Sequence, residues 1–325
     1  MTVSDWRPSA PLVNLKDRAA LLAQLRTFFS DRAVLEVETP LLSQATVPDP
    51  GIEVFPVPAA GSETAPRYLQ TSPEFAMKRL LAAGTGDIYQ ISKAFRQGEA
   101  GRHHNPEFTL LEWYRVGWDH AALIREVAEL LSAVLGTKGW QVWPYRALFI
   151  ELLDIDPMAD GDPCAVPESW LSVARSRLCD VPQDLDRDAF LDLLMSHCIE
   201  PTLGDWDVVF VTDFPPSQAA LARKTRVAGH SVAARFECYV QGRELANGYW
   251  EQSDASSLAQ QLKADNARRR YRQLAKQPID QRLLAAHEHG LPECAGVALG
   301  VDRLLALKLA ADSLAEVISF TWPVA

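Results

Sequence analysis

Arginine and histidine residues gather between two apolar runs typical of buried strands, Ile88 to Phe95 and Phe108 to Tyr114. The segment reads Phe95-Arg96, then Arg102-His103-His104-Asn105-Pro106-Glu107-Phe108. A guanidinium group binds phosphate oxygens through several planar contacts, and a phenylalanine ring offers a face on which a purine stacks. We interpret the segment as a strand–loop–strand unit that binds a polyphosphate and a base. The alternative is a solvated turn whose Phe108 belongs to the core.

Three glutamates at intervals of seven residues form a second group, Glu237, Glu244 and Glu251. The pattern predicts two strands, Arg235 to Val240 and Glu244 to Tyr249, joined by a tight Gln-Gly turn. Glu237 and Glu244 would then lie close enough to share Mg²⁺, which prefers one or two carboxylates together with substrate phosphate oxygens. The alternative is that these side chains face solvent.

Small residues mark a third group, Gly296-Val297-Ala298-Leu299-Gly300, followed by Val301-Asp302-Arg303. Small residues on a strand let a ligand approach the backbone closely. Arg303, at the start of the next helix, would place its guanidinium over a base. The alternative is a packed strand–helix junction with a surface ion pair.

The surrounding pattern predicts the elements that position these groups. Ser72-Pro73-Glu74 is typical of a helix start, with Ser72 as N-cap and Pro73 in the first helical position. The other expected elements are a helix over Leu15 to Phe29, a strand over Val34 to Glu38 stopped by Pro40, a loop or irregular hairpin over Pro48 to Pro66, a helix over Leu123 to Val134, a strand over Val208 to Val211, a polar helix over Ser257 to Gln277, and a strand turning into a helix over Gly296 to Leu309.

Strands from both ends of the chain, interrupted by an acidic helical stretch from Asp154 to Asp207, fit an α+β fold with a mixed, mostly antiparallel sheet. We expect one catalytic domain over residues 1–325, with residues 154–207 as a helical insertion. The cluster Arg268-Arg269-Arg270-Arg272 on the polar helix is interpreted as a solvated face. The alternative is a docking site for an acidic protein partner.

The composition and charge of the chain disfavour several classes of protein. The 325 residues are 48% hydrophobic and 23% charged, with a net charge of −10. This balance is that of a globular protein, and the acidity disfavours extensive nucleic-acid binding. No apolar run or leader is apparent, so we expect a cytoplasmic protein that does not cross a membrane. The cysteines are expected to be reduced thiols, Cys164, Cys179, Cys198, Cys238 and Cys294.

Taken together, the three groups resemble the second and third signature motifs of class II aminoacyl-tRNA synthetases, with the E-L-A-N-G stretch of the lysine branch between them. Asp31 to Pro40 resembles the first motif, which implies a homodimer interface. From Leu15 to Ser319 the chain is similar to the catalytic domain of lysyl-tRNA synthetases. The anticodon-reading domain is not expected here, because the helix leading into the first motif begins near Leu15.

The closest resemblance is to the freestanding paralogues of that family that activate (R)-β-lysine with ATP and transfer it to a lysine side chain of elongation factor P. The stretches R-H-H-N-P-E-F-T-L-L-E-W-Y, E-L-A-N-G and G-V-A-L-G-V-D-R carry it. The resemblance implies ATP and Mg²⁺ as cofactors, elongation factor P and lysine or (R)-β-lysine as partners, and no tRNA.

The resemblance also implies a role for each matching residue. Arg96 and Arg303 are the expected catalytic residues: Arg96 holds the α-phosphate, and Arg303 and Phe108 sandwich the adenine. His104 contacts the γ-phosphate and Asn105 the adenine edge through its backbone. The remaining nucleotide contacts are Gln97, Gly98, Glu244, Leu245 and Gly300. Glu237 and Glu244 carry Mg²⁺.

The substrate residues follow in the same way. Ser72, Pro73 and Glu74 line the amino end of the substrate, Glu112, Tyr114 and Glu251 bind its side-chain ammonium, and Asn247 and Ala298 complete the pocket. An ammonium in a closed site needs carboxylate and hydroxyl acceptors, because burying an unpaired charge is costly.

Three positions depart from the family pattern. The second motif usually reads F-R-N-E, whereas this chain has Phe95-Arg96-Gln97-Gly98, and Glu99 is the candidate to replace the missing carboxylate. Tyr249-Trp250 is bulkier than the usual pair. Ala298 stands where lysyl-tRNA synthetases carry glycine, and its methyl group is expected to favour (R)-β-lysine over α-lysine.

Two other functions stay open on the sequence. One is a freestanding lysyl-tRNA synthetase-like enzyme that acts on tRNA or another small acceptor. The other is a non-catalytic synthetase fold that serves as a scaffold, which the presence of Arg96, both glutamates and Arg303 disfavours.

Overall fold

The computed structural model describes residues 6–59, 65–162, 165–182 and 184–325. These divide into two compact units, and each is described by itself. Unit 1 comprises residues up to Trp118, Ala133–Leu135 and Gln252–Ala325, and unit 2 comprises Asp119–Ser132 and Gly136–Glu251. The expectation of a single domain stays a prediction.

Unit 1 is built on strands β1, β5, β6 and β12, in that order across the sheet. Only β1 and β5 are parallel; β5 with β6 and β6 with β12 are antiparallel. A small antiparallel sheet, β2-β4-β3, accompanies it. The elements of unit 1 are α1 (Leu12–Ser30), β1 (Leu35–Glu36), β2 (Leu42–Ser43), β3 (Pro56–Val57), β4 (Arg67–Leu69), α2 (Glu74–Ala82), β5 (Ile88–Phe95), β6 (Glu107–Val116), α7 (Ala255–Tyr271), α8 (Gln281–Gly290), β12 (Cys294–Gly300), α9 (Val301–Lys308) and η4 (Leu314–Glu316).

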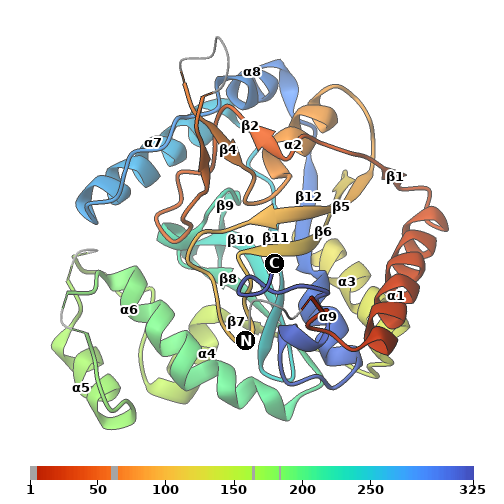
Figure 1. Ribbon diagram of the computed structural model, residues 1–325. Coiled ribbons are helices and arrows are strands. Elements are labelled where there is room, and N and C mark those ends of the chain that lie inside the picture. Colours follow the sequence, from red (N-terminus) through yellow and green to blue (C-terminus); the bar gives the residue numbers. More distant parts are fainter. Residues whose placement is uncertain (1–5, 60–64, 163–164, 183) are drawn as a thin grey trace. The chain divides into compact units, whose positions relative to one another are not determined.

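Helix α1, drawn in red in Figure 1, is held to the sheet by aromatic packing. Phe29 at its end stacks on Tyr89 of β5 with ring centroids 4.5 Å apart and meets Trp113 of β6 edge-on at 5.2 Å. Offset and edge-to-face contacts add to the free energy gained by burying the rings. This helix leads into the first motif, Asp31 to Pro40, so its packing holds the start of that motif against the strands of the second.

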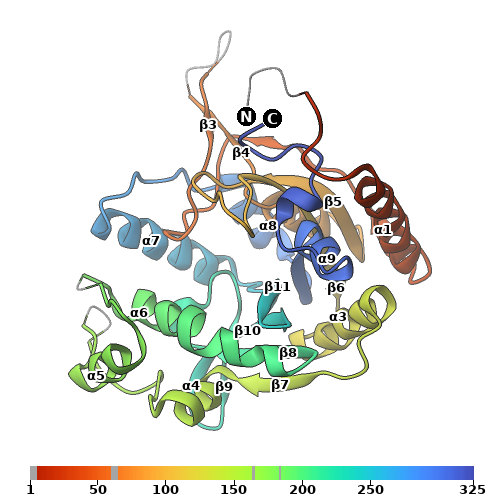
Figure 2. The ribbon, with the colours of Figure 1, turned by 60° about the horizontal axis from the view of Figure 1, so that its bottom comes forward.

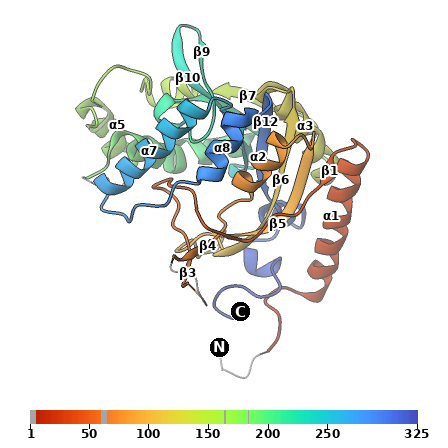
Figure 3. The same ribbon diagram turned by 90° about the horizontal axis from the view of Figure 1, so that it is seen from above.

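Helices α2 and α8 lie side by side in Figure 3 and are in contact. Met77 and Leu81 of α2 pack with Ile88, Tyr114 and Cys294 of the three central strands. Helix α8 was not expected from the sequence, although Asp280 caps it by accepting from the N–H groups of Arg282 and Leu283. An aspartate N-cap followed by apolar residues at helical spacing is typical of a helix start, and this pattern would have indicated α8 from the sequence.

Unit 2 is built on strands β11, β10, β8 and β7, in that order, with β9 paired to β10. The β7–β8 pair is parallel and the others are antiparallel. The elements of unit 2 are α3 (His120–Leu135, its last three residues grouped with unit 1), β7 (Gln141–Pro144), α4 (Tyr145–Leu153), α5 (Glu168–Arg177), α6 (Arg187–Leu194), η1 (Met195–Ile199), η2 (Glu200–Asp205), β8 (Val208–Phe214), η3 (Pro216–Gln218), β9 (Lys224–Val227), β10 (His230–Val240) and β11 (Arg243–Trp250).

The stretch from Asp154 to Asp207 contains helices α5, α6, η1 and η2 and no strand among its described residues, as its helical pattern predicted, with irregular segments before α5 and between α5 and α6. Residues 163, 164 and 183 lie outside the described part. Helix α4 is in contact with β7 and β8, and Figure 2 shows it beneath these strands. Phe149, Phe190, Leu194 and Tyr239 belong to the core shared by these helices and the strands. The α+β fold with a mixed, mostly antiparallel sheet is confirmed.

Three expectations about local structure need correction. The strand expected over Val34 to Glu38 is shorter and covers only Leu35–Glu36, which is β1. The helix expected to start at Ser72 begins at Glu74 with Pro73 as N-cap, although the Ser72 hydroxyl does accept the Glu74 N–H at 3.0 Å. The polar helix ends at Tyr271 rather than Gln277, because Gln277 turns back and exchanges two hydrogen bonds with the Asn266 side chain. Residues 60–64 of the expected loop lie outside the described part.

The basic cluster on α7 is not a uniformly solvated face. Arg269 is fully buried, and its guanidinium donates to the carbonyl oxygens of Asp49 and Ala275 and pairs with Glu53 at 3.0 Å. A fourth hydrogen bond reaches the Ile52 carbonyl oxygen at 3.2 Å. These bonds to backbone and carboxylate oxygens make Arg269 a structural residue that anchors α7. Arg268 is also engaged, in an ion pair with Asp265 at 2.6 Å.

Cys179, Cys198, Cys238 and Cys294 are free thiols, as expected, whereas Cys164 lies outside the described residues. None of the helices in the described ranges has the length and apolar content needed to span a bilayer.

The Gln241-Gly242 turn between β10 and β11 is confirmed, with φ of +51° and +71°. A Cβ atom on Gly242 would lie 2.9 Å from the carbonyl oxygen of Glu200. Gly242→Ala should therefore destabilise the fold by about 2 to 5 kcal/mol, the sum of a left-handed alanine and an overpacked contact.

Gly229→Ala is the matched control, since Gly229 has φ of +85° but no neighbour within 4 Å of its Cβ position. It should cost only about 1 to 2 kcal/mol in urea unfolding. Equal losses in the two variants would mean that the Glu200 contact has no energetic effect.

Candidate active site

A buried carboxylate with two hydroxyl donors lies at the centre of unit 1. Glu112 of β6 is 2% exposed, and its two oxygens accept from the Ser72 hydroxyl at 2.8 Å and the Tyr114 hydroxyl at 2.7 Å. Glu112 and Tyr114 are two residues apart on one strand and so share a face of the sheet. The structure thus brings together Ser72, Glu112 and Tyr114, which the sequence assigned to the substrate.

Ala298 of β12 lies directly opposite Glu112 in the strand register. Side chains of directly opposed residues in an antiparallel pair lie on the same face, so the Ala298 methyl group lies beside the Glu112 side chain. Ala298 is only partly buried, whereas Val297 and Leu299 on either side are buried in the core. This arrangement places the departure from the family's glycine next to the buried carboxylate.

Glu74 begins α2 and is paired with a lysine one turn later. The Lys78 ammonium is 2.6 Å from Glu74 Oε1 and is itself only 1% exposed. His287 of α8 lies close enough for the Lys78 charge to act on it, and burial, followed by that charge, lowers the pKa of its imidazole. The histidine is therefore neutral at physiological pH, and Lys78 forms its ion pair with Glu74.

Arg96 carries an unused donor. Its guanidinium lies 5.1 Å from the centre of the Phe108 ring and 3.8 Å from the Glu99 carboxylate. Its Nε is buried and makes no hydrogen bond to any described residue. A buried donor without a partner is costly, so this atom is suited to an acceptor that a ligand supplies, such as a phosphate oxygen.

The backbone explains the absent motif carboxylate. Gly98 has φ of +84°, a region that glycine occupies freely and that an L-glutamate would enter only with strain. Gln97, before it, is pinned by its N–H to the Glu53 carbonyl at 2.9 Å. A glutamate at position 98 would be strained at this φ, and Glu99, the next residue, is engaged with Arg96.

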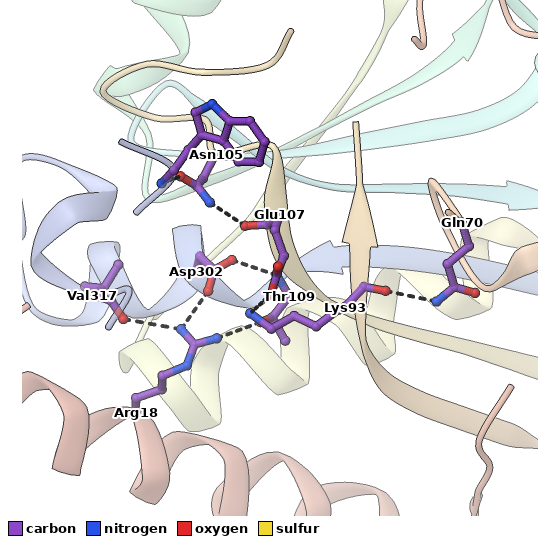
Figure 4. Close-up of polar contacts among 9 residues, drawn as sticks. Arg18, Gln70, Lys93, Asn105, Glu107, Thr109, Asp302 and Val317 are labelled. Carbon is purple, nitrogen blue, oxygen red and sulfur yellow. Dashed lines mark hydrogen bonds and ion pairs between the residues drawn. The ribbon is translucent and has the colours of Figure 1, made fainter. Parts of the chain in front are cut away.

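The loop also contacts the C-terminal segment. The Asn105 amide donates to the Glu107 carbonyl at 2.6 Å, which Figure 4 shows, and its oxygen accepts the Trp322 N–H at 2.9 Å. Arg102 donates to the Asp312 carbonyl at 2.7 Å. The Asn105 side chain thus connects the loop to Glu107 and to the C-terminal segment.

Arg303 and His104, predicted to bind different parts of one nucleotide, are neighbours. Arg303 Nη2 lies 2.7 Å from His104 Nε2. Gly300 ends β12 as the N-cap of α9, and a Cβ there would be in ordinary contact with the Arg303 side chain at 3.8 Å. Within unit 1, the nucleotide residues thus form two contacting pairs, Arg96 with Phe108 and His104 with Arg303.

In unit 2, Glu237 and Glu244 lie on the paired strands β10 and β11 on either side of the tight turn, as the sequence predicted. A bulge between Cys238 and Tyr239 shifts the register, so that Glu237 lies opposite Asn247 and Glu244 lies opposite Tyr239. The two carboxylates still interact: burial raises the pKa of Glu237, Arg235 opposes that rise, and the charge of Glu244 adds to it. They are electrostatic neighbours without being direct strand partners.

Sequence reasoning missed Arg235 and Tyr239, which hold Glu237. Arg235 pairs with one Glu237 oxygen, the Tyr239 hydroxyl donates to the other, and the Arg235 guanidinium packs over the Phe214 ring at 4.6 Å. Burial alone would lower the pKa of Arg235, but the Glu237 charge raises it, so the guanidinium stays charged. The available signal was an arginine and a glutamate alternating with apolar residues on a buried strand.

The remaining predicted residues of unit 2 lie on β11 and just beyond it. The Asn247 amide contacts both Arg235, at 3.3 Å, and Glu237, at 3.4 Å. Glu251 is 1% exposed and forms a bridge with Ala222, whereas Leu245 is a core residue that could offer a ligand only its backbone. Trp250 packs against the Arg223 guanidinium at 4.5 Å.

The fold and these residues define a class II synthetase-type catalytic core. The chain belongs to the family of class II tRNA synthetases for D, K and N, whose model matches residues 2–322. Its curated relatives include the elongation factor P–(R)-β-lysine ligases of Edwardsiella ictaluri, 48% identical with 98% of each chain covered, and of Vibrio cholerae, 48% identical with 99% of each chain covered. The ligase of Salmonella typhi is also 48% identical, over 97% of each chain.

Removing either hydroxyl that donates to Glu112 should destabilise the fold, because the buried carboxylate loses a donor. We expect Ser72→Ala and Tyr114→Phe each to lower the free energy of unfolding by about 1 to 3 kcal/mol. Tyr89→Phe is the control: its hydroxyl also donates to a glutamate, Glu36, at 2.9 Å, but that carboxylate is exposed. Its loss should be below about 1 kcal/mol, and equal losses in all three variants would contradict a special role of burial.

Proposed function

We propose that this protein is an ATP-dependent ligase that activates (R)-β-lysine as an adenylate and transfers it to a lysine side chain of elongation factor P. The observation that carries the proposal is the 48% identity to ligases of that name over nearly the whole of both chains. Membership of the synthetase family implies ATP use. The net charge of −10 favours a protein acceptor over tRNA.

The first step is attack by a substrate carboxylate oxygen on the α-phosphorus of ATP, which forms a P–O bond and releases pyrophosphate. Arg96 holds the α-phosphate in this proposal, a role that its buried, unused Nε supports. His104 contacts the γ-phosphate, and Phe108 and Arg303 enclose the adenine, with Gln97, Gly98, Leu245 and Gly300 as further contacts. Catalysis then comes from positioning and charge neutralisation, with no protein nucleophile.

The substrate's amino groups are assigned to the buried carboxylates. Glu74, with Ser72 and Pro73, is proposed to receive the amino end. Glu112, Tyr114 and Glu251 are proposed to receive the side-chain ammonium, and Asn247 and Ala298 are proposed as further substrate contacts. The two hydroxyl donors on Glu112 support this role, because they orient the carboxylate before a cation arrives. In the second step the acceptor lysine nitrogen attacks the acyl carbon, an amide bond forms, and AMP and a proton leave.

Glu237 and Glu244 are proposed to hold Mg²⁺, which would offset the negative charge of the ATP phosphates. Their mutual repulsion supports the assignment, since a cation would relieve it. The described residues contain no cluster of three or more acidic, histidine or cysteine ligands, so substrate oxygens would have to complete the coordination.

A homodimer through α1 and β1 is also proposed. Leu12, Val13 and Leu35 of these elements are more than half exposed, and exposed apolar side chains are typical of an interface.

An acceptor assay tests the proposal. Purified elongation factor P or lysine tRNA is incubated with the protein, ATP, Mg²⁺ and (R)-β-lysine, and each acceptor is analysed by intact-mass spectrometry. We expect the mass of one lysyl residue on the protein and none on the tRNA. Charging of tRNA alone would favour the synthetase-like alternative, and absence of lysine-dependent pyrophosphate exchange would favour the scaffold.

Arg303→Ala should abolish adenylate formation while leaving the fold intact, because the guanidinium contacts His104 at the surface and little of the core. Pyrophosphate exchange and thermal unfolding, measured on the same preparation, separate the two effects. Near-normal exchange in a folded variant would remove Arg303 from the nucleotide site.

Ala298→Gly should shift the preference from (R)-β-lysine towards α-lysine without changing the ATP requirement. The methyl group lies beside Glu112, and one methylene-sized change in a pocket is worth about 1 to 3 kcal/mol of discrimination. Adenylate formation with both isomers measures the ratio. An unaltered ratio would assign the discrimination to Glu74, Tyr249 or Trp250.

A further inference from the structure

Three segments far apart in the sequence meet at one buried carboxylate in unit 1. Asp302 of α9 accepts from Arg18 Nη1 of α1 at 2.6 Å and from the Thr109 backbone N–H of β6 at 2.7 Å. Arg18 Nη2 also donates to the Thr109 hydroxyl at 2.7 Å, which closes a triangle visible in Figure 4. We call Arg18, Thr109 and Asp302 the α1–β6–α9 triangle.

The triangle supplies a hydrogen-bond acceptor to β6 just beyond the point where its pairing with β12 ends. The ladder between β12 and β6 stops with Gly300 opposite Leu110, because the chain then turns into α9. The next N–H along β6 is that of Thr109, and Asp302 accepts it in place of a strand partner. The Asp302 side chain is only 4% exposed, so its charge depends on Arg18 for compensation.

The positions of these residues in the chain connect them to the nucleotide residues. Thr109 directly follows Phe108, and Asp302 directly precedes Arg303. Successive side chains of a strand point to opposite faces, so Thr109 lies on the face of β6 away from Phe108. The triangle therefore fixes the backbone beside both planar groups from behind, where it would not touch a nucleotide.

We propose that Arg18, Thr109 and Asp302 are positioning residues that set the spacing between Phe108 and Arg303. ATP affinity then depends on Arg18 of α1, the helix that leads into the first motif. This inference rests on the proposed function, in which those two side chains enclose the adenine. A stack tolerates little error in the separation of its two faces, because dispersion falls steeply with distance. Loosening the triangle therefore weakens ATP binding more than lysine binding.

The test uses Arg18→Met, which keeps the side-chain bulk and removes the charge, and Arg18→Lys as the conservative variant. We expect Arg18→Met to raise the KM for ATP in pyrophosphate exchange at least tenfold, with the KM for the lysine substrate changed less than twofold. Arg18→Lys should recover part of the ATP affinity, since an ammonium compensates Asp302 but does not span both acceptors as a guanidinium does.

Arg115→Met is the matched control. At the other end of β6, Arg115 donates to Asp87 at 2.8 Å, and Asp87 also accepts the Val116 N–H at 2.7 Å, so the same architecture recurs at the far end of the strand. This variant should lose stability comparably and keep its KM for ATP. Equal changes in ATP KM for Arg115→Met and Arg18→Met would reduce the triangle to a general stabilising role and overturn the inference.

Thr109→Val guards against a variant that does not fold, because it removes only the hydroxyl and leaves the backbone bond to Asp302. We expect a twofold to fivefold weaker ATP affinity, measured by calorimetry with ATP alone. Unchanged ATP affinity in folded Arg18→Met, or in Thr109→Val if the former does not fold, would refute the positioning role. Failure of the wild-type protein to bind ATP would instead refute the proposed function, so the two failures are distinguishable.

Discussion

An ionised carboxylate removed from water must receive donors from the protein, and this constraint governs both units. Glu112 receives two hydroxyls, Asp302 a guanidinium and a backbone N–H, and Glu237 a guanidinium and a phenol. Each solution requires residues from fixed places on neighbouring elements. Each carboxylate is therefore held in place within its own unit before any ligand binds, and fixed groups are what catalysis by positioning requires.

The solutions differ in what they leave available. The two hydroxyls that donate to Glu112, from Ser72 and Tyr114, are neutral and do not offset a negative charge. Asp302 is neutralised by Arg18, which suits a structural role. Glu237 lies between these cases, because Arg235 opposes the repulsion from Glu244 without removing it. The chemistry expected of each carboxylate follows from the charge of its donors.

Much of the fold and the site could be predicted from the sequence, since apolar periodicity located β5, β6, β10 and β11 and the motifs located their polar residues. The register of Glu237 could not, because the bulge after Cys238 leaves no mark in the residue pattern. Arg269 and Arg18 were also beyond reach: a buried arginine and a solvated one look alike until the chain segments that supply their acceptors are known. From the sequence, Gly98 could be recognised only as a missing carboxylate. Its positive φ, a backbone conformation that favours glycine, became visible only in the structure.

The bond between Asn105 and Trp322 has a consequence for the order of folding. The two residues are 217 positions apart, and synthesis at about 5 to 20 residues per second separates them by roughly 10 to 40 seconds. Through that interval the loop that carries His104 lacks the contact that holds it, although β5 and β6 on either side can already pair. The β5–β6 hairpin can thus form well before the contact that holds the loop carrying His104.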